Sequence, residues 1–317
     1  MSYINNVITH PGGCELGPRP IDLHLAGLKQ LGAKITESHG YIFCECNKLS
    51  GAEIHLDYPS VGATENIMLA AVSAEGLTTI HNAAREPEIE DLQLFLNKMG
   101  AKVEGAGSST VKIEGVKRFN PVEHTIMPDR IVAGTYLTAA AITGGDLYLS
   151  GVVSDHIRPI IAKLTESGCS IKEYDNNIHI IGSKRLKAIE VVKTQPYPGF
   201  ATDMQPQVMS LCTISKGTSV FIETVFESRY KHAEELVKMG ANIQIDGRTA
   251  IIRGVKKLTG AHVCARDLRG GAALVIAGLA AEGTTIIDNI NTHVDRGYEK
   301  LEIKLKRIGA DIQRISV

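Results

Sequence analysis

The chain has 317 residues, of which 44% are hydrophobic and 22% are charged, a composition typical of a globular protein of about two domains. Its 34 basic and 35 acidic residues nearly cancel, which disfavours a nucleic-acid-binding protein because such proteins need a broad basic surface. No apolar run without glycine is longer than the one at residues 272–277, which is too short to cross a bilayer, so we expect no membrane contact. No export signal is visible and the six cysteines are sparse, so we expect a cytoplasmic protein with free thiols.

An internal repeat organises the chain. A helix that ends in Gly followed by Ala or Cys recurs every 68 to 72 residues, at Gly32, Gly100, Gly168, Gly240 and Gly309. A second marker, Gly before a β-branched or apolar strand, stands 23 to 26 residues ahead of four of these, at Gly76, Gly145, Gly217 and Gly283. Two markers that stay in phase over four units indicate a repeated structural unit.

Each unit is predicted to have the order α-β-α-β-β. Helices rich in small residues are expected over 133–143 and 272–281, and a β-branched strand over 218–222. Amphipathic helices carry apolar residues at helical spacing, namely Ile157, Ile160, Ile161 and Leu164 in one unit and Tyr298, Leu301, Leu305 and Ile308 in another. Because the first kind of helix is almost wholly apolar, we expect it to be buried with sheets outside it.

The first unit is incomplete. The chain enters just before the loop at residues 9–13, and no small-residue helix precedes it. A domain rarely starts halfway through its own repeat. We therefore expect a fragment, a split subunit or a shortened descendant of a longer protein.

Charged residues collect at two junctions of the repeat, both of which precede helices. The starts of the small-residue helices carry Ser60, Asp129, Arg130, Asp203, Asp267 and Arg269. The strand-to-helix loops carry Arg19, Arg85, Arg158, Arg229 and Arg296. One interpretation is structural, since Asp caps helices and Arg braces them. The other is functional, because arginines at helix N-termini suit a phosphorylated or carboxylated ligand.

Cys14 is the sharpest single candidate for chemistry. Its loop, residues 11–20, is too rich in Gly and Pro for a core helix or strand. A loop thiol near arginine has a lowered pKa and acts as acid or nucleophile, although an unused surface thiol is an equal alternative. The sequence holds no His-Glu-x-x-His, no Cys-x-x-Cys and no phosphate-binding loop, so we predict no metal and no cofactor.

Several motifs together resemble the UDP-N-acetylglucosamine 1-carboxyvinyltransferase family, the enolpyruvyl transferases that begin peptidoglycan precursor synthesis. The resemblance extends over essentially the whole chain, and its marks are the segments at 11–24, 59–64, 82–89, 128–131, 202–205, 267–269 and 294–299. The loop cysteine argues against the related enzyme of the shikimate pathway, which shares the fold but lacks this residue.

The resemblance implies an α/β fold, an inside-out α/β barrel of two domains built from units of about 70 residues. Six such units would need roughly 420 residues, so the chain is N-terminally incomplete by this comparison. Residues 1–126 would be the remainder of the first transferase domain, which carries the Cys14 loop, and residues 127–317 would form the second. A further chain that supplies the N-terminal segment is a potential partner.

The resemblance also implies the chemistry. The substrates would be UDP-N-acetylglucosamine and phosphoenolpyruvate, with addition at C2 of the latter followed by loss of phosphate. Asp203 matches the catalytic base, and Cys14 matches the loop thiol that donates a proton and that fosfomycin alkylates. The cations on the phosphoenolpyruvate side are Arg19, Arg269 and Arg296. The contacts with the UDP-sugar are Arg19, Pro20, Ile21, Asp22, Leu23, Tyr58, Pro59, Ser60, Val61, Asp203 and Val225.

Two departures from the family pattern favour an alternative. Val132 stands where the family has glutamate, and the family's lysine–asparagine motif and one arginine would lie upstream of Met1. Loss of one preorganised charge contact costs about 10²–10³ in rate. The alternative function is therefore a non-catalytic UDP-sugar-binding relative, or one part of a split enzyme.

Overall fold

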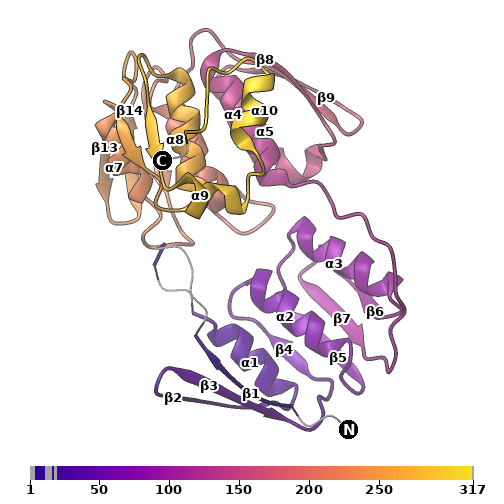
Figure 1. The fold of residues 1–317 in the computed structure, drawn as a ribbon. Helices are drawn as coiled ribbons and strands as arrows, with labels where there is room; N and C mark the ends of the chain where they lie inside the picture. Colours follow the sequence, from indigo (N-terminus) through magenta and orange to yellow (C-terminus); the bar gives the residue numbers. More distant parts are fainter. Residues whose placement is uncertain (1–3, 11–15, 18–19, 316–317) are drawn as a thin grey trace. The chain divides into compact units, whose positions relative to one another are not determined.

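The computed structural model describes residues 4–10, 16–17 and 20–315, which fall into two compact units. The first unit extends to Met127, and the second begins at Pro128 and also includes Leu16 and Gly17. Figure 1 shows the helices and strands of each unit.

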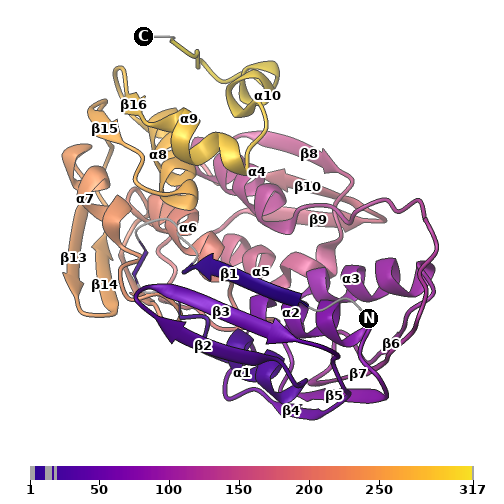
Figure 2. The ribbon, with the colours of Figure 1, turned by 60° about the horizontal axis from the view of Figure 1, so that its bottom comes forward.

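The described residues of the first unit form two sheets and three helices. Its helices are α1 (Asp22–Gln30), α2 (Val61–Ala71) and α3 (Pro87–Lys98). Its strands are β1 (Ile4–Thr9), β2 (Lys34–Ser38), β3 (Tyr41–Cys46), β4 (Glu53–His55), β5 (Leu77–His81), β6 (Lys102–Glu104) and β7 (Thr110–Glu114). One sheet has the order β1-β3-β2 and is antiparallel, and the other has the order β4-β5-β7-β6. Figure 2 shows α1 against one face of the first sheet, where Leu25, Ile35 and Ile42 form a buried cluster.

The second unit repeats a similar set of elements. Its α-helices are α4 (Arg130–Thr143), α5 (Arg158–Glu166), α6 (Gln205–Cys212), α7 (Lys231–Lys238), α8 (Leu268–Ala280), α9 (Ile290–His293) and α10 (Leu301–Arg307). Short 3-10 helices are η1 (Ser154–Ile157), η2 (Thr202–Met204) and η3 (Val294–Arg296). Its strands are β8 (Asp146–Ser150), β9 (Ser170–Tyr174), β10 (Asn177–Ile181), β11 (Val191–Lys193), β12 (Thr218–Ile222), β13 (Asn242–Asp246), β14 (Thr249–Arg253), β15 (His262–Cys264) and β16 (Ile286–Asp288). The sheets have the orders β8-β10-β9, β11-β12-β14-β13 and β15-β16.

The small-residue helices form the centre of the second unit. Helices α4, α6 and α8 pack against one another, and every residue of α6 is buried. Close approach requires glycine at one point, because a Cβ on Gly134 of α4 would lie 2.9 Å from Met204 Sδ and 3.0 Å from Ile160 Cδ1. The expectation that these helices are buried is confirmed here.

The units that contain α2, α6 and α8 have one strand more than the sequence pattern predicts, whereas none of the described residues directly before α4 forms such a strand. Strands β4, β11 and β15 each precede a small-residue helix, and each pairs in parallel with the strand that follows that helix. The predicted strand at 218–222 is β12, and Ile157, Ile160 and Leu164 are buried as expected. The pattern wrongly places Ile308 on the apolar face of its helix, since Ile308 is 54% exposed where α10 ends.

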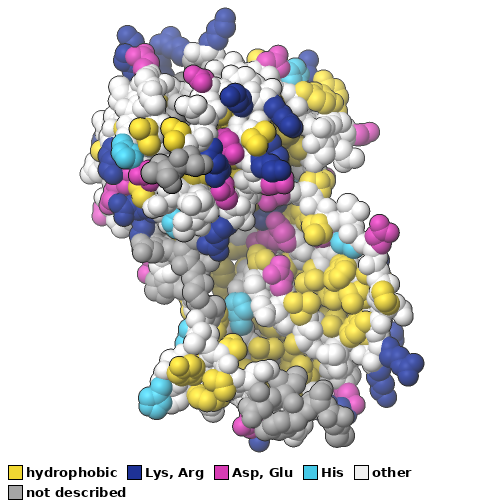
Figure 3. Space-filling view, in the orientation of Figure 1, with side chains coloured by type: hydrophobic (Ala, Val, Ile, Leu, Met, Phe, Trp, Pro, Cys, Tyr) yellow, Lys and Arg dark blue, Asp and Glu magenta, His cyan; other side chains and the backbone are white. Residues whose placement is uncertain are grey.

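Hydrophobic side chains also reach the surface of the first unit. In Figure 3 they gather over α2 and α3. Leu69 of α2 and Leu94 of α3 are 52% and 56% exposed, respectively. The single small-residue helix of this unit is therefore less enclosed than its three counterparts in the second unit.

Candidate active site

The carboxylate of Asp203 lies between two arginine side chains in the second unit. Asp203 belongs to η2, immediately before α6. Its Oδ1 is 3.0 Å from Arg229 Nη2, and its Oδ2 is 3.1 Å from Arg269 Nε. The side chain of Asp203 is 39% exposed, whereas those of Arg229 and Arg269 are 1% and 12% exposed. Buried cations thus hold a carboxylate that still reaches solvent.

Two opposing influences act on the pKa of Asp203. Enclosure by protein favours the protonated form and would raise the pKa. The positive charges of Arg229, Arg269 and Arg130 outweigh this effect, so the pKa lies below its ordinary value. Asp203 is therefore ionised at neutral pH and can accept a hydrogen bond from a ligand hydroxyl.

Arg229 is fixed by more than its pairing with Asp203. It lies in the loop before α7, and its Nη2 also donates to the Thr202 carbonyl at 3.1 Å. The guanidinium stands over the Phe226 ring, 5.6 Å from the centroid. Because a buried guanidinium is costly unless it is paired, these contacts determine where Arg229 lies. Its position in turn orients the Asp203 turn.

Arg269 extends from the first turn of α8 and stacks on Tyr298. The guanidinium carbon is 5.3 Å from the centroid of that ring. Burial would lower the pKa of Arg269, but Tyr298 and Asp203 raise it above its ordinary value. Its Nη1 is buried and has no hydrogen-bond partner among the described residues. This nitrogen is a charged donor that would meet an anionic ligand only after the enclosed Arg269 side chain moves.

Asp129 and Asp267, two of the aspartates that the sequence marks before helices, act as helix caps. Asp129 Oδ1 accepts from the backbone N–H groups of Ile131 and Val132 at 2.8 and 2.9 Å, which caps α4. Asp267 Oδ1 caps α8 in the same way, accepting from Arg269 N at 3.1 Å and from Gly270 N at 2.9 Å. The capping interpretation therefore holds for these two residues but not for Asp203.

A buried histidine lies behind this cluster. His232 Nδ1 is 3.1 Å from the Arg229 carbonyl oxygen, so this nitrogen carries the proton. Burial lowers the pKa of His232 to about 4, with Asp267 opposing and Arg229 reinforcing the shift. The ring is therefore neutral at pH 7, so His232 adds no positive charge beside Arg229.

The other predicted residues of the second unit are spread more widely. Val225 follows β12, and its N–H donates to Glu223 Oε1 at 2.8 Å. Arg296 is exposed at the end of η3. Val132 is half-buried and, like Tyr136 and Leu268, packs against a core cluster of the second unit. Of the predicted residues here, the structure joins Asp203 and Arg269 directly.

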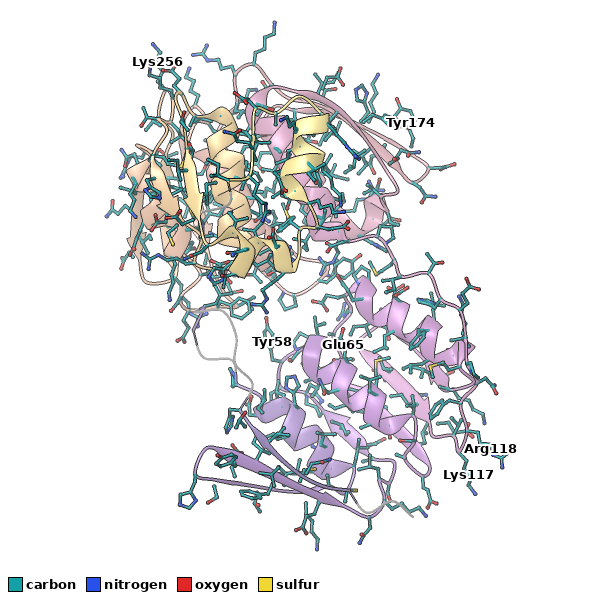
Figure 4. The ribbon with its side chains drawn as sticks, in the orientation of Figure 1. Tyr58, Glu65, Lys117, Arg118, Tyr174 and Lys256 are labelled. Carbon is teal, nitrogen blue, oxygen red and sulfur yellow. The ribbon has the colours of Figure 1, made fainter. Side chains whose placement is uncertain are left out.

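The predicted residues of the first unit lie at the N-terminal ends of α1 and α2. Pro20, Ile21, Asp22 and Leu23 lead into α1, and Tyr58, Pro59, Ser60 and Val61 lead into α2. The two ends are neighbours, because a Cβ on Gly62 of α2 would lie 2.9 Å from Nε2 of His24 in α1. Tyr58 is 42% exposed, and Figure 4 shows it with Glu65 near the start of α2. Free N–H groups and the helix dipole favour anions at such ends.

Cys14 and Arg19 lie outside the described residues. Between them, Leu16 is buried and its carbonyl accepts from the Ser228 N–H at 3.2 Å. Ser228 directly precedes Arg229. The described part of the cysteine loop is therefore anchored one residue away from an arginine that holds Asp203.

Neither a metal cluster nor a membrane span is found in the part of the chain that the structure describes. Over these residues, no three His, Cys, Asp or Glu side chains are placed to bind a metal ion together. The helices of the same part are all too short or too polar to cross a bilayer.

Sequence reasoning left some residues of this cluster out of the predicted site. The sequence marks Arg229 and Arg130 as members of the set of charged residues that recur before helices, but it assigns neither of them a role at the site. His232 carried no signal, because a histidine in an amphipathic helix is usually a packing residue. Recurrence of arginine before the helices was the one pattern that pointed to Arg229.

Comparison with known proteins gives consistent results. Residues 1–305 match the family model of EPSP synthase (3-phosphoshikimate 1-carboxyvinyltransferase). UDP-N-acetylglucosamine 1-carboxyvinyltransferase 2 of Caldanaerobacter subterraneus subsp. tengcongensis is 59% identical over 308 residues, which cover 97% of this chain and 74% of the relative. The corresponding enzyme 1 of Symbiobacterium thermophilum is 57% identical, with coverages of 97% and 70%.

Solved structures support the fold. The enolpyruvyl transferase NikO from Streptomyces tendae has a TM-score of 0.84 at 25% identity, covering 93% of this chain and 72% of its own. EPSP synthase from Acinetobacter baumannii has a TM-score of 0.74 at 23% identity, with coverages of 98% and 74%. At that identity the second likeness concerns the fold alone. The fold expected from the sequence is confirmed.

Proposed function

The chain belongs to the UDP-N-acetylglucosamine 1-carboxyvinyltransferase family and is an enolpyruvyl transferase, and we propose that it acts on UDP-N-acetylglucosamine and phosphoenolpyruvate. In this reaction the 3-hydroxyl oxygen of the amino sugar bonds to C2 of phosphoenolpyruvate while the methylene carbon gains a proton. That carbon then loses a proton as the C2–O bond to phosphate breaks, which leaves the enolpyruvyl ether and free phosphate.

The observation that carries the proposal is the setting of Asp203. An ionised carboxylate that reaches solvent can accept the proton of the attacking hydroxyl. In the free chain the arginines lower the pKa of Asp203 and so weaken it as a base. A phosphate or carboxylate that draws Arg269 away from Asp203 would raise the pKa of Asp203, so the base would strengthen when the second substrate is present.

Arg269 supplies the principal cation for phosphoenolpyruvate in this proposal. Its unpartnered Nη1 is a donor for a phosphate or carboxylate oxygen, and Arg19 and Arg296 would add further positive charge. Cys14 would protonate the methylene carbon and assist the departure of phosphate, and it would be the residue that fosfomycin alkylates.

The UDP-sugar is assigned to the other predicted residues. The neighbouring N-terminal ends of α1 and α2, with residues 20–23 and 58–61, suit a diphosphate-bearing ligand. Val225 and Asp203 would contact the sugar. We assign the two units to the remainder of the first transferase domain and to the second domain.

The product of this reaction is committed to peptidoglycan, so we place the enzyme in the cytoplasm at the start of cell-wall synthesis, with consequences for cell shape and division. The enzyme name that the relatives carry supports the assignment to peptidoglycan synthesis. No cofactor is required for the addition and elimination steps, since every proton can be exchanged with side chains or water.

The test is release of phosphate from phosphoenolpyruvate by the purified chain, with and without UDP-N-acetylglucosamine. We expect release that depends on the sugar and is lost in Cys14→Ala, while Cys212→Ala, which removes a buried thiol, retains it. Stabilisation of the folded chain by the sugar without any release would contradict the proposal and favour a non-catalytic UDP-sugar-binding relative. Release without the sugar would contradict it in a different way, as simple hydrolysis.

A further inference from the structure

A buried carboxylate links the Asp203 turn to the Val225 loop. Glu223, at the end of β12, is 1% exposed. No Lys, Arg or His side chain of the described residues forms an ion pair with it at 4.0 Å or less. Four hydrogen-bond donors surround it instead, and they come from three separate segments of the second unit.

One oxygen of Glu223 holds the Val225 loop. Its Oε1 accepts from Val225 N at 2.8 Å, from Phe226 N at 3.2 Å and from Thr194 Oγ1 at 2.9 Å. Backbone N–H groups buried without partners are costly, so these bonds fix the loop as it leaves β12. The same loop leads into Ser228 and Arg229.

The other oxygen of Glu223 holds the turn that carries Asp203. Its Oε2 accepts from Thr202 Oγ1 at 3.0 Å. The Thr202 carbonyl in turn accepts from Arg229 Nη2 at 3.1 Å, and that nitrogen also contacts Asp203. Thr202 is therefore held at its hydroxyl by Glu223 and at its carbonyl by the arginine that pairs with the adjacent carboxylate.

A third segment makes the arrangement rigid. Thr194, at the end of β11, is fully buried and bonds to Thr224 twice. Its Oγ1 accepts from Thr224 N at 2.8 Å, and its carbonyl accepts from Thr224 Oγ1 at 2.6 Å. A displacement of Glu223 would therefore move both the Asp203 turn and the Val225 loop, which are also joined further along the chain by the contacts of Arg229 with Thr202 and Asp203.

We propose that Glu223 is a positioning residue. It holds the Asp203 turn and the Val225 loop at a fixed distance and orientation relative to each other, so that both can contact the sugar substrate. The inference rests on the proposed function, in which Asp203 faces the sugar hydroxyl and Val225 contacts the sugar. Glu223 touches neither substrate. A misplacement of about 1 Å at such a site costs about 10²-fold in rate, so a residue that fixes two contacts at once has a large indirect effect.

The variants separate hydrogen bonding from charge and from packing. Glu223→Gln keeps one acceptor for the two N–H groups and places an amide donor opposite the Thr202 hydroxyl, which can accept. Glu223→Met has a similar length but no hydrogen bonds. Thr202→Val cuts only the link to the Asp203 turn, and Thr202→Ser restores it. Glu235→Met is the matched control, because Glu235 is fully buried in the same unit but bonds to Lys238, Cys264 N and Arg266.

Steady-state kinetics should distinguish these variants by their kcat and by their KM for UDP-N-acetylglucosamine. We expect Glu223→Met to lower kcat about tenfold and to raise KM for UDP-N-acetylglucosamine about tenfold, with Glu223→Gln recovering most of both. Thr202→Val should lower kcat with little change in that KM, because the Val225 loop stays anchored. Glu235→Met should lower the stability of the fold without these separate changes in kcat and in KM for UDP-N-acetylglucosamine. Equal losses in kcat and KM for Glu223→Met and Glu235→Met would overturn the proposal.

Amide hydrogen exchange supplies a readout that does not need turnover. In Glu223→Met, exchange should accelerate both at residues 225–226 and at residues 202–204, and in Thr202→Val only at the latter. Acceleration confined to 225–226 in Glu223→Met, or spread evenly through the unit, would refute the linkage. If the unsubstituted chain neither binds UDP-N-acetylglucosamine nor releases phosphate, the proposed function fails, whereas the exchange pattern still decides whether Glu223 joins the two segments.

Discussion

Two candidate residues of the second unit, Asp203 and Arg269, belong to a network of charges, whereas those of the first unit surround the exposed ends of two helices. In the second unit, Asp203 is held by Arg229 and Arg269, which are themselves enclosed. In the first, Tyr58 is 42% exposed and the Ser60 side chain makes no capping hydrogen bond. Under the proposed function, the region in the second unit would carry the chemistry and the region in the first unit would bind the UDP-sugar. Substitutions in the two regions should therefore affect different quantities.

The largest effect is expected from Asp203→Asn. The amide preserves the shape of the side chain but cannot take the proton of the attacking hydroxyl, so kcat should fall about 10³-fold. Binding of UDP-N-acetylglucosamine, measured by calorimetry, should change little. Asp155→Asn is the control, because Asp155 is 78% exposed and pairs only locally with Arg158. A value of kcat within threefold of the unsubstituted chain would remove Asp203 from the proposed chemistry.

Substitution of Arg269 should have the next largest effect. Arg269→Met keeps the packing on Tyr298 but removes the charge, so kcat/KM for phosphoenolpyruvate should fall about 10²–10³-fold. Arg269→Lys should recover only part of this, because an ammonium cannot contact Asp203 and a ligand in the same plane. Arg253→Met, at the exposed end of β14, should match the unsubstituted chain. A change confined to the KM for UDP-N-acetylglucosamine would contradict this, because Arg269 would then contact the sugar and not phosphoenolpyruvate.

The buried charge network should also make stability depend on pH. The pKa of His232 is about 4 in the folded chain and 6.5 as its ordinary value. The unfolded chain therefore binds a proton more readily, so the contribution of His232 is fully present above pH 6.5 and is lost as the pH falls towards 4. At pH 5 the loss should be about 1–2 kcal/mol relative to pH 7. Urea unfolding should show this loss in the unsubstituted chain.

His232→Gln should make that pH dependence smaller. The amide still donates to the Arg229 carbonyl but does not titrate. His262→Gln is the matched control, since His262 is 64% exposed and bonds to Asp288. An unchanged pH profile in His232→Gln would show that another group controls acid stability.

The smallest effect is expected in the first unit, at Ser60. Because the Ser60 side chain makes no cap, Ser60→Ala should change the free energy of unfolding by less than about 0.5 kcal/mol. Loss of one ligand hydrogen bond should raise KM for UDP-N-acetylglucosamine about threefold to tenfold, with kcat unchanged. Ser73→Ala, at the other end of α2, should leave both values as they are. A fall in kcat would show that the two regions are not separable in this way.

Much of the fold was predictable because it depends on local periodicity. The repeat spacing and the small-residue helices follow from residues close together in sequence, and so does the strand at 218–222. The short parallel strands β4, β11 and β15 were missed, since three residues carry too little pattern. Their pairing depends on the strand beyond the next helix.

The candidate site was harder to predict for a related reason. Arg229 and Arg269 lie 26 and 66 residues after Asp203 in the sequence. The three side chains meet only through the packing of α6, α7 and α8. The pattern that marked Asp203 also marked Asp129 and Asp267, which are helix caps. Residue type and position before a helix could not separate these roles, whereas the arginine contacts do.

The pKa of the Asp203 carboxyl group tests the central claim most directly. Carbon-13 NMR of the full chain, with aspartate labelled at the carboxyl carbon and the signal assigned from Asp203→Asn, would follow its ionisation with pH. We predict a pKa below the ordinary 3.8 in the unsubstituted chain, and a higher value in Arg269→Met and with bound phosphoenolpyruvate. A pKa at or above 3.8 that does not respond to Arg269→Met would contradict the account, because Asp203 would then not be held by its arginines.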